Sequence, residues 1–201
     1  IAMADAVTAV SQRYAEETKT PEFGCGMEGA LTARGDAYSG ILNGIDYDVW
    51  NPAKDRTIYH NYVADTIEEK EENKKRLLED SGLKYIEHLP LVAVSSRLDD
   101  QKGTDFIASI AEEMMKMNLQ LIVYGTGDQR YTDMFNMLKS HYPQKVAIYF
   151  KQDTVVEHRI FAGADIIMKP SRFEPCGTGH LKALKYGAVP LVRETGGLAD
   201  T

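Results

Sequence analysis

Cysteine is scarce in this chain of 201 residues, which contains two, Cys25 and Cys176, far apart in the sequence. They form no CxxC pair, so a zinc site of that kind is excluded, and nothing indicates a framework of disulfides. We therefore expect a reducing compartment. The five histidines have neither HExxH nor HxH spacing, and no metal site is predicted from them.

Excess basic charge and long apolar runs are also lacking. The formal net charge is -7, which argues against non-specific binding to nucleic acid or membrane surfaces, because both require an excess of Lys and Arg. No apolar run approaches the length of a membrane span. The first residues carry Asp5 and lack the basic region of a signal peptide. What remains, 43% hydrophobic and 26% charged residues, is the composition of an ordinary soluble domain.

The two ends of the chain suggest a piece of a longer protein. The chain begins on an apolar segment without an initiator Met and ends on GGLADT, which reads as the middle of an element. We expect further residues on both sides.

The first part of the chain is irregular. We predict a strand at residues 6–10, a helix capped by Ser11, a glycine-rich loop at residues 21–35 before a short helix, a strand at residues 40–42, and a turn at Asn43-Gly44.

From residue 64 onward, apolar runs alternate with helical patterns. Strands are predicted at residues 89–94, 119–124, 146–150, 165–168 and 189–192, and helices at residues 64–79, 104–117 (with Thr104 as N-cap), 130–141, 155–163 and 177–186. Continuous apolar strands separated by helices indicate a parallel sheet buried on both faces. Right-handed crossovers then give an α/β fold with a doubly wound, Rossmann-like sheet.

In such a fold, ligands bind beyond the carboxyl ends of the strands. The turns at residues 95–103, 125–129, 151–154, 170–179 and 193–197 are therefore the candidate ligand-binding segments.

The turn SSRLDDQKG places Arg97 and Lys102 just past a strand. Two cations there suit an anionic group, because Arg offers a planar fork of donors and Lys a point charge. A solvated loop, in which Asp99 and Asp100 neutralise these cations, is an equally open interpretation.

The turn at residues 170–179 carries the most chemistry. Glu174 precedes a helix start at which Gly177 and Gly179 leave backbone N–H groups free for a phosphate. Together with Arg172, Arg97 and Lys102, it would form a pocket of mixed charge for a diphosphate and a sugar hydroxyl. The alternative is that Glu174 merely stabilises the helix.

Two other features have simpler explanations. Gly125-Thr126-Gly127-Asp128 follows a strand but lacks the third glycine of a dinucleotide fingerprint, which favours a tight turn near the ligand over a dehydrogenase. Cys176 could be a nucleophile at a helix start, but no His/Asn partner pattern accompanies it, and we expect a wall residue of the pocket.

Four segments carry a family resemblance. They are ILNGIDYDVWNPAKD (residues 41–55), SSRLDDQKG (95–103), PSRFEPCG (170–177) and YGAVPLVRETGGLADT (186–201). In order and in combination they resemble bacterial glycogen synthases and plant starch synthases, glycosyltransferase family 5. The resemblance implies two Rossmann-like domains facing across a cleft (GT-B), with residues 1–39 ending the first domain and residues 40–201 forming most of the second.

The activity implied by the resemblance is transfer of glucose from ADP-glucose, or UDP-glucose in some members, to the non-reducing end of an α-1,4-glucan. Configuration is retained, and neither a metal nor a cofactor is needed. The implied partners are the nucleotide-sugar donor and the α-glucan acceptor, and the implied location is the bacterial cytoplasm or a plant plastid. This segment alone is expected to be inactive, because half of the cleft belongs to the first domain.

The resemblance also implies residue roles. Arg97 and Lys102 would neutralise the diphosphate leaving group as the glycosidic bond breaks. Glu174 would hold glucose hydroxyls and orient the donor, with no covalent intermediate. The other implied donor contacts are Gln101 beside the glucose, Asn43 at the hinge, Cys176 and Gly177 in the sugar pocket, and the backbone N–H groups of Thr178 and Gly179 on the distal phosphate.

The chain departs from the family pattern after PCG, where members usually continue Leu-Thr-Gln-Leu-Tyr and this chain has Thr178, Gly179, His180, Leu181 and Lys182. It also has Lys151-Gln152 where many members have Gly-Tyr, with the Tyr stacking on the base. Two alternatives stay open: a related transferase with a non-glucan acceptor, and a non-catalytic homologue that binds glucan or nucleotide.

Overall fold

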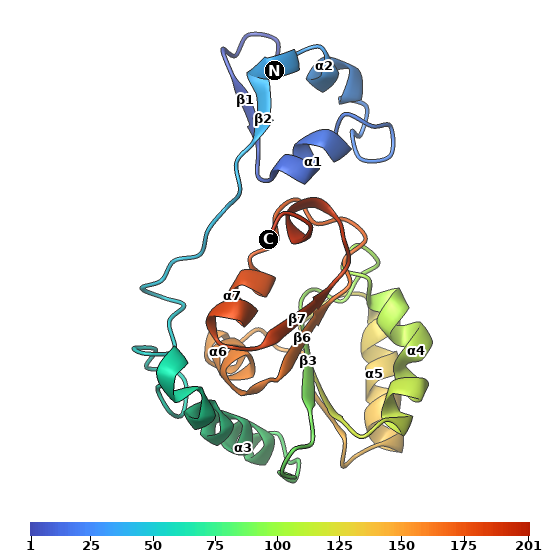
Figure 1. The fold of residues 1–201 in the computed structure, drawn as a ribbon. Coiled ribbons are helices and arrows are strands. Elements are labelled where there is room, and N and C mark those ends of the chain that lie inside the picture. The colour runs from blue at the N-terminus through green and yellow to red at the C-terminus, as the bar shows by residue number, and fades with distance from the viewer.

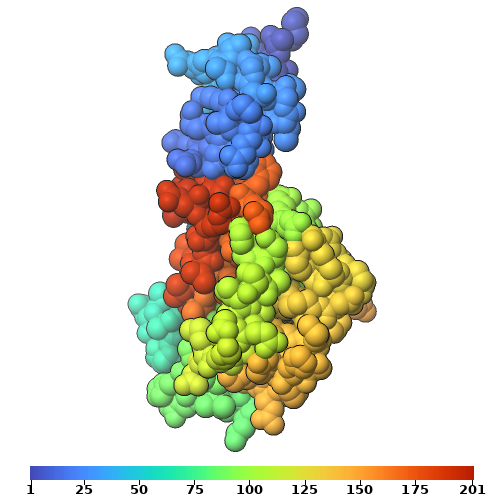
Figure 2. All heavy atoms as spheres, turned by 90° about the vertical axis from the view of Figure 1, so that its right-hand side faces the viewer, coloured from blue at the N-terminus to red at the C-terminus, as the bar shows by residue number.

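The computed structural model describes all 201 residues and shows a small N-terminal unit beside a larger one (Figure 1). In the small unit, strands β1 (Val7–Ala9) and β2 (Tyr38–Gly40) pair in parallel. Its helices are α1 (Gln12–Glu17), α2 (Glu28–Thr32) and the 3-10 helix η1 (Gly35–Ala37). The space-filling view shows this unit against the C-terminal segment of the chain (Figure 2). No helix in either unit is both long enough and apolar enough to cross a membrane.

The larger unit is built on one five-stranded parallel sheet. Its strands are β3 (Leu91–Ser95), β4 (Gln120–Tyr124), β5 (Val146–Tyr149), β6 (Ile166–Lys169) and β7 (Val189–Val192). They lie in the order β5-β4-β3-β6-β7. The direction of winding reverses between β3 and β6, and such a switch point is where open α/β sheets bind ligands.

Helices cover both faces of this sheet, with α4 and α5 on one face and α3, α6 and α7 on the other (Figure 1). The helical segments of the larger unit are η2 (Ala64–Glu69), α3 (Lys70–Asp80), α4 (Thr104–Lys116), α5 (Gln129–His141), α6 (Thr154–Gly163), α7 (Gly179–Lys185) and η3 (Gly196–Leu198). This is the predicted doubly wound, Rossmann-like α/β fold.

The two faces explain why the strands are apolar throughout. In β3, Leu91 and Ala93 belong to the core cluster under α3, α6 and α7, whereas Val92 and Val94 belong to the cluster under α4 and α5. A strand buried on both faces has no solvent side, so the alternation typical of a half-exposed strand disappears.

Three predictions in the N-terminal part were wrong. The loop expected at residues 21–35 contains helix α2. The strand expected at residues 40–42 is β2, which ends at Gly40, and Asn43-Gly44 forms no turn. Residues 41–46 have no regular structure because they carry the chain from the small unit to the larger one (Figure 1).

Three helical segments also differ from prediction in their first turns. The helix expected at residues 64–79 is instead a 3-10 segment, η2, with non-helical angles at Thr66 (φ -127, ψ 42), followed by α3. The N-cap of α4 is Gly103 rather than Thr104: its φ is 71, and a Cβ there would lie 2.1 Å from the backbone oxygen of Pro170. Helix α7 begins at Gly179, two residues later than expected.

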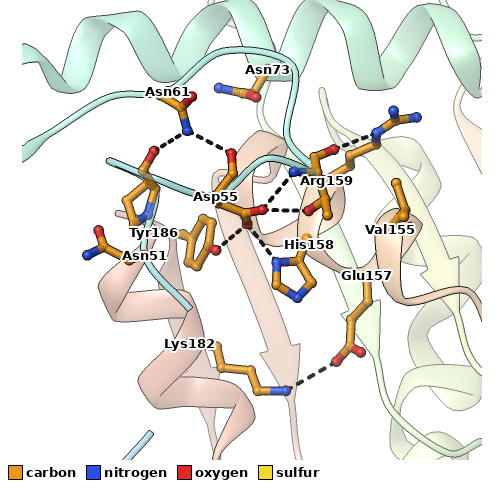
Figure 3. A network of polar contacts seen from close by, with 12 residues as sticks. Asn51, Asp55, Asn61, Asn73, Val155, Glu157, His158, Arg159, Lys182 and Tyr186 are labelled. Carbon is orange, nitrogen blue, oxygen red and sulfur yellow. Dashed lines mark hydrogen bonds and ion pairs between the residues drawn. The ribbon is translucent and has the colours of Figure 1, made fainter. Parts of the chain in front are cut away.

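The segment that joins the two units, residues 41–57, is held on the larger one by a buried carboxylate, that of Asp55 (Figure 3). Oδ2 of Asp55 accepts a hydrogen bond from the Tyr186 hydroxyl (2.5 Å) and lies 2.6 Å from Nδ1 of His158. Oδ1 accepts from the backbone N–H (2.9 Å) and the hydroxyl (2.6 Å) of Thr57. The ring of Trp50 stacks on His158 with centroids 3.9 Å apart. The joining segment is therefore attached to α6 and α7.

Candidate functional site

The turns after β3 and β6 meet at the switch point of the sheet. Nζ of Lys102, from the first turn, lies 2.7 Å from Oε2 of Glu174, from the second. The hydroxyl of Ser171 donates to the same oxygen at 3.0 Å. The side chains of Lys102 and Glu174 are 17% and 7% exposed, so this ion pair is largely removed from water, where charge interactions are strong.

Arg97 and Gln101 lie on the same turn as Lys102 and connect it to the other one. Nη2 of Arg97 donates to Oε1 of Gln101 at 2.9 Å. The backbone oxygen of Gln101 accepts from the backbone N–H of Arg172 (2.9 Å). The side-chain amide of Gln101 donates to the backbone oxygen of Phe173 (3.4 Å). The two turns thus hold each other through backbone as well as side-chain contacts.

The interpretation of this turn as a solvated loop, with its cations neutralised by Asp99 and Asp100, holds for Arg97 but not for Lys102. Arg97 is exposed and pairs with Asp99 (3.1 Å). Asp100, however, faces Arg130 and Tyr131 of α5, and Lys102 pairs with Glu174 rather than with either aspartate. One cation therefore points across the site and the other borders solvent.

Arg172 does not join the pocket of mixed charge, so that prediction was wrong. Its guanidinium pairs with Asp105 in the first turn of α4 and lies over the ring of Phe106, 4.1 Å from the centroid. The nearby carboxylate and aromatic face hold it on the outside of the turn.

Cys176 is buried beside the joining segment. Burial raises the pKa of its thiol, against a smaller lowering by the backbone of Asn43, so the thiol is not activated as a nucleophile would be. The same contact places Asn43 next to the site. This agrees with a wall position for Cys176.

The glycines after Glu174 are required by close packing. Gly177 has a φ of 66, and a Cβ on it would lie 2.7 Å from Cγ of Glu174. A Cβ on Gly179 would lie 2.8 Å from Nζ of Lys169. Thr178 is the N-cap of α7, and its side chain makes no capping hydrogen bond. The backbone is thus shaped around the carboxylate and a buried lysine.

A cavity of about 650 Å³ opens at the same edge of the sheet, within the usual size range of small-molecule sites. Its wall includes Arg97 from the turn after β3, Thr126 from the turn after β4, and Gln152 and Asp153 from the turn after β5. Of the predicted site residues, Arg97 alone lines it. The cavity therefore borders the turn after β3, which also carries Lys102.

Gly125 and Gly127 serve the contact between two turns rather than a dinucleotide. A Cβ on Gly125 would lie 1.8 Å from the oxygen of Ser96, and one on Gly127 would lie 2.1 Å from the oxygen of Leu98. Side chains at these positions would separate the segments after β3 and β4. The tight turn expected at residues 125–128 is not seen, because Gly127 instead forms an isolated parallel bridge with Leu98.

Two buried residues of the site were missed from the sequence. Lys169, the last residue of β6, donates from Nζ to the oxygen of Ser95 at 2.9 Å. His180 is 1% exposed; its Nε2 lies 2.7 Å from the hydroxyl of Thr201, and its Nδ1 has no partner. Burial and the charge of Lys169 lower the pKa of His180. The sequence gives one indication of Lys169, namely a lysine at the end of an apolar run, and none of the burial of His180. No three His, Cys, Asp or Glu side chains are grouped to hold a metal ion.

The small unit touches the site directly. The hydroxyl of Ser11 donates to the oxygen of Pro175 (2.6 Å), and Oε1 of Glu17 accepts from the N–H of Gly196 (2.9 Å). Phe173 packs between Tyr14 and Phe23, with centroid distances of 5.3 and 5.7 Å. Both neighbours of Glu174 in the chain are therefore held by residues 1–40.

Comparisons with known proteins agree with this geometry. Residues 69–201 match the family model of glycosyl transferases group 1, and residues 1–33 match the model of the starch synthase catalytic domain. The glycogen synthase of Clostridium perfringens is 49% identical over 98% of this chain and 41% of its own length. That of Pseudothermotoga lettingae is 45% identical over 100% of this chain and 41% of its own length. The chain thus spans 41% of the length of these curated relatives.

Solved structures give the same fold. The catalytic domain of starch synthase IV from Arabidopsis thaliana, bound to ADP and acarbose, matches with a TM-score of 0.91 and 35% identity over 98% of this chain and 41% of that one. Anabaena HepE in complex with UDP and glucose matches with a TM-score of 0.63 and 17% identity, over 98% and 46% of the two chains. At that identity the second match supports the fold alone.

Proposed function

The chain belongs to the family of glycosyl transferases group 1, and on that premise we propose that it forms the donor side of a retaining glucosyltransferase that extends an α-1,4-glucan. The donor is ADP-glucose, with UDP-glucose as the alternative, and no metal or cofactor takes part. The observation that carries this proposal is the buried pair of Lys102 and Glu174 at the switch point, in a chain similar to glycogen synthases along its whole length.

The charges of the site suit departure of a nucleoside diphosphate. In the free protein Glu174 neutralises Lys102. When the donor is bound, a sugar hydroxyl takes the place of the ammonium on the carboxylate, and Lys102 turns to the phosphates. Because the diphosphate gains negative charge as the glycosidic bond breaks, a fixed cation stabilises the transition state more than the bound donor.

The neighbouring residues complete the donor site. The nucleoside lies in the cavity bordered by Arg97 and Gln152, and the glucose lies near Gln101, Cys176 and Gly177. The backbone N–H groups of Thr178 and Gly179 hold the distal phosphate, and Asn43 closes the site from the joining segment. The similarity to a starch synthase bound to ADP supports adenine as the base.

Binding is tested by calorimetry of ADP and UDP with the purified protein. We expect a measurable dissociation constant for ADP and a weaker one for UDP. If both remain silent at millimolar concentration, there is no nucleotide-sugar site in this chain.

Transfer is tested in the two-domain protein that the resemblance implies, with ADP-glucose and glycogen. Lys102→Ala is expected to lower kcat far more than acceptor affinity, whereas Lys116→Ala, an exposed lysine on α4, leaves both unchanged. A change confined to the KM for the acceptor would rule out the leaving-group role. Binding without product would identify a non-catalytic homologue, and transfer to a different acceptor but not to glycogen would identify a related transferase.

A further inference from the structure

Lys169 lies between the two turns that form the donor site. It ends β6 and is 8% exposed, and its Nζ donates to the oxygen of Ser95 at the end of β3 (2.9 Å). On its other side, a Cβ on Gly179 would lie 2.8 Å from both Nζ and Cε. The ammonium thus fills a space that exists because Gly179 has no side chain.

The charge of this ammonium is not balanced by a carboxylate of its own. No Asp or Glu lies within ion-pair distance of Lys169, Glu174 is taken by Lys102 and Ser171, and Glu157 pairs with Lys182. One of its three donors is used by Ser95. A buried ammonium without a counter-ion is costly, so an anion that arrives at this point gains a strong interaction.

Resting on the proposed function, we infer that Lys169 is a donor-binding residue whose ammonium contacts the diphosphate of the nucleotide sugar and shares with Lys102 the neutralisation of the leaving group. Gly179 then makes room for the Lys169 ammonium at this site, because any side chain at position 179 would displace Nζ. The absence of the family's usual threonine at this position is in this way linked to the presence of the lysine.

The surroundings of Lys169 give this role a pH signature. The charged and titratable groups that face it are Glu174, Lys102, Glu157, Lys182 and His180. Burial lowers the pKa of Lys169 to about 8, with the attraction of Glu174 opposing this shift and the repulsion of Lys102 adding to it. A diphosphate binds the protonated form, so its affinity falls as the pH rises through that value.

The test is calorimetry with ADP and with adenosine at pH 7 and pH 9, or with UDP and uridine if UDP is the tighter ligand. In the wild type, ADP affinity is expected to fall about tenfold between these pH values, because about nine-tenths of the lysine is neutral one pH unit above its pKa. Adenosine affinity stays constant. Lys169→Met is expected to weaken ADP about tenfold or more at pH 7 and to remove the pH dependence, since one charge-assisted contact is lost. Lys116→Met, which also removes one positive charge, behaves as the wild type.

The outcomes separate this inference from the proposed function. If neither nucleotide binds the wild type, both fall together. If ADP binds the wild type and Lys169→Met equally well, or if ADP and adenosine weaken by the same factor, the role of Lys169 is refuted and the proposed function stands. If Lys169→Met does not fold, the wild-type pH profile decides, and an ADP affinity that is the same at pH 7 and pH 9 refutes the inference.

Discussion

Replacing Asp55 by Asn tests whether the joining segment is fixed to the larger unit by one buried carboxylate. The Asp55 side chain is 3% exposed, and its two oxygens are surrounded by Thr57, His158 and Tyr186 (Figure 3). Asparagine has nearly the same shape but presents an NH2 group in place of one oxygen. That group faces either the two donors of Thr57 or the Tyr186 hydroxyl and the His158 ring.

The expected loss follows from these contacts. Hydrogen bonds to a charged group contribute about 1.5–3 kcal/mol each, and the NH2 group of asparagine replaces the acceptor of two of them. We therefore expect Asp55→Asn to lower the free energy of unfolding by about 3–5 kcal/mol at pH 7. In a chain of this size each kcal/mol changes Tm by about 2–4 °C, so the melting temperature should fall by roughly 6–20 °C.

The pH dependence gives a second check. Burial raises the pKa of Asp55, but the hydrogen bonds from Thr57, Tyr186 and His158 outweigh it and the pKa is lowered. A depressed carboxyl pKa stabilises the folded state above the unfolded value, near 4, and this contribution is lost as the pH falls through the folded value. The difference between wild type and variant should therefore shrink below about pH 4.

Urea unfolding at pH 7 and pH 3, monitored by circular dichroism, measures both effects. Asp48→Asn is the matched control, because Asp48 lies on the same segment with its side chain 88% exposed. Its ion pair with Lys54 is at the surface, so a loss below about 1 kcal/mol is expected from it. A loss of less than about 1 kcal/mol at pH 7, or a difference that does not depend on pH, would refute the reasoning.

Three further predictions concern stability. Glu17→Ala leaves the N–H of Gly196 without its partner between the two units, and we expect urea unfolding to report a loss of about 1–3 kcal/mol. Gly163→Ala places a Cβ 2.8 Å from Cδ2 of Leu77, where α3 and α6 approach, and a similar loss of about 1–3 kcal/mol in thermal unfolding is expected from overpacking. Burial lowers the pKa of Lys70 to about 7, so the wild type should gain stability between pH 7 and pH 9, because the unfolded chain still binds a proton that the folded chain has released. Lys70→Met should reduce this slope.

Each of these has a discriminating result. Gly29→Ala is the control for Gly163→Ala, because no atom lies within 4 Å of the added Cβ; equal effects at both positions would argue against close packing of α3 on α6. An unchanged stability in Glu17→Ala would mean that this contact adds nothing to the interface. A pH slope that is the same in wild type and Lys70→Met would remove Lys70 as its source.

The strands and most helices could be predicted because their cause is local. A parallel strand buried on both faces must be apolar at every position, and the predicted and observed β7 agree at both ends, Val189 and Val192. The meeting of Lys102 and Glu174 followed from topology, since both come just after strands of one parallel sheet. The errors arose where a distant segment decides the local structure. Gly103 caps α4 because Pro170 lies against it, and no pattern near residue 103 records that contact.

Lys169 shows the same limit within the site. A lysine at the end of an apolar strand usually extends into solvent, and its sequence neighbours give no other indication. Its burial depends on Ser95, 74 residues away, and on a glycine at the start of α7. The prediction for Arg172 was wrong in the opposite sense. Its position in the turn suggested a ligand contact, but its guanidinium pairs with Asp105 on α4. In both cases the choice between solvent, protein and ligand is made by a residue on another element.

The position of Glu174 depends on both units. Within the larger unit, Lys102 and Ser171 hold its carboxylate, and its backbone oxygen accepts from the N–H of Gly197. From the small unit, Ser11 holds the oxygen of the next residue, and two aromatic rings enclose the residue before it. A carboxylate restrained from both sides keeps its orientation when its ion pair is replaced by a ligand, because the backbone that carries it does not depend on that pair. This rigidity suits the proposed role of Glu174, which is to hold glucose hydroxyls in one orientation. The contacts made by residues 1–40 thus belong to the proposed donor site as much as the residues that border it.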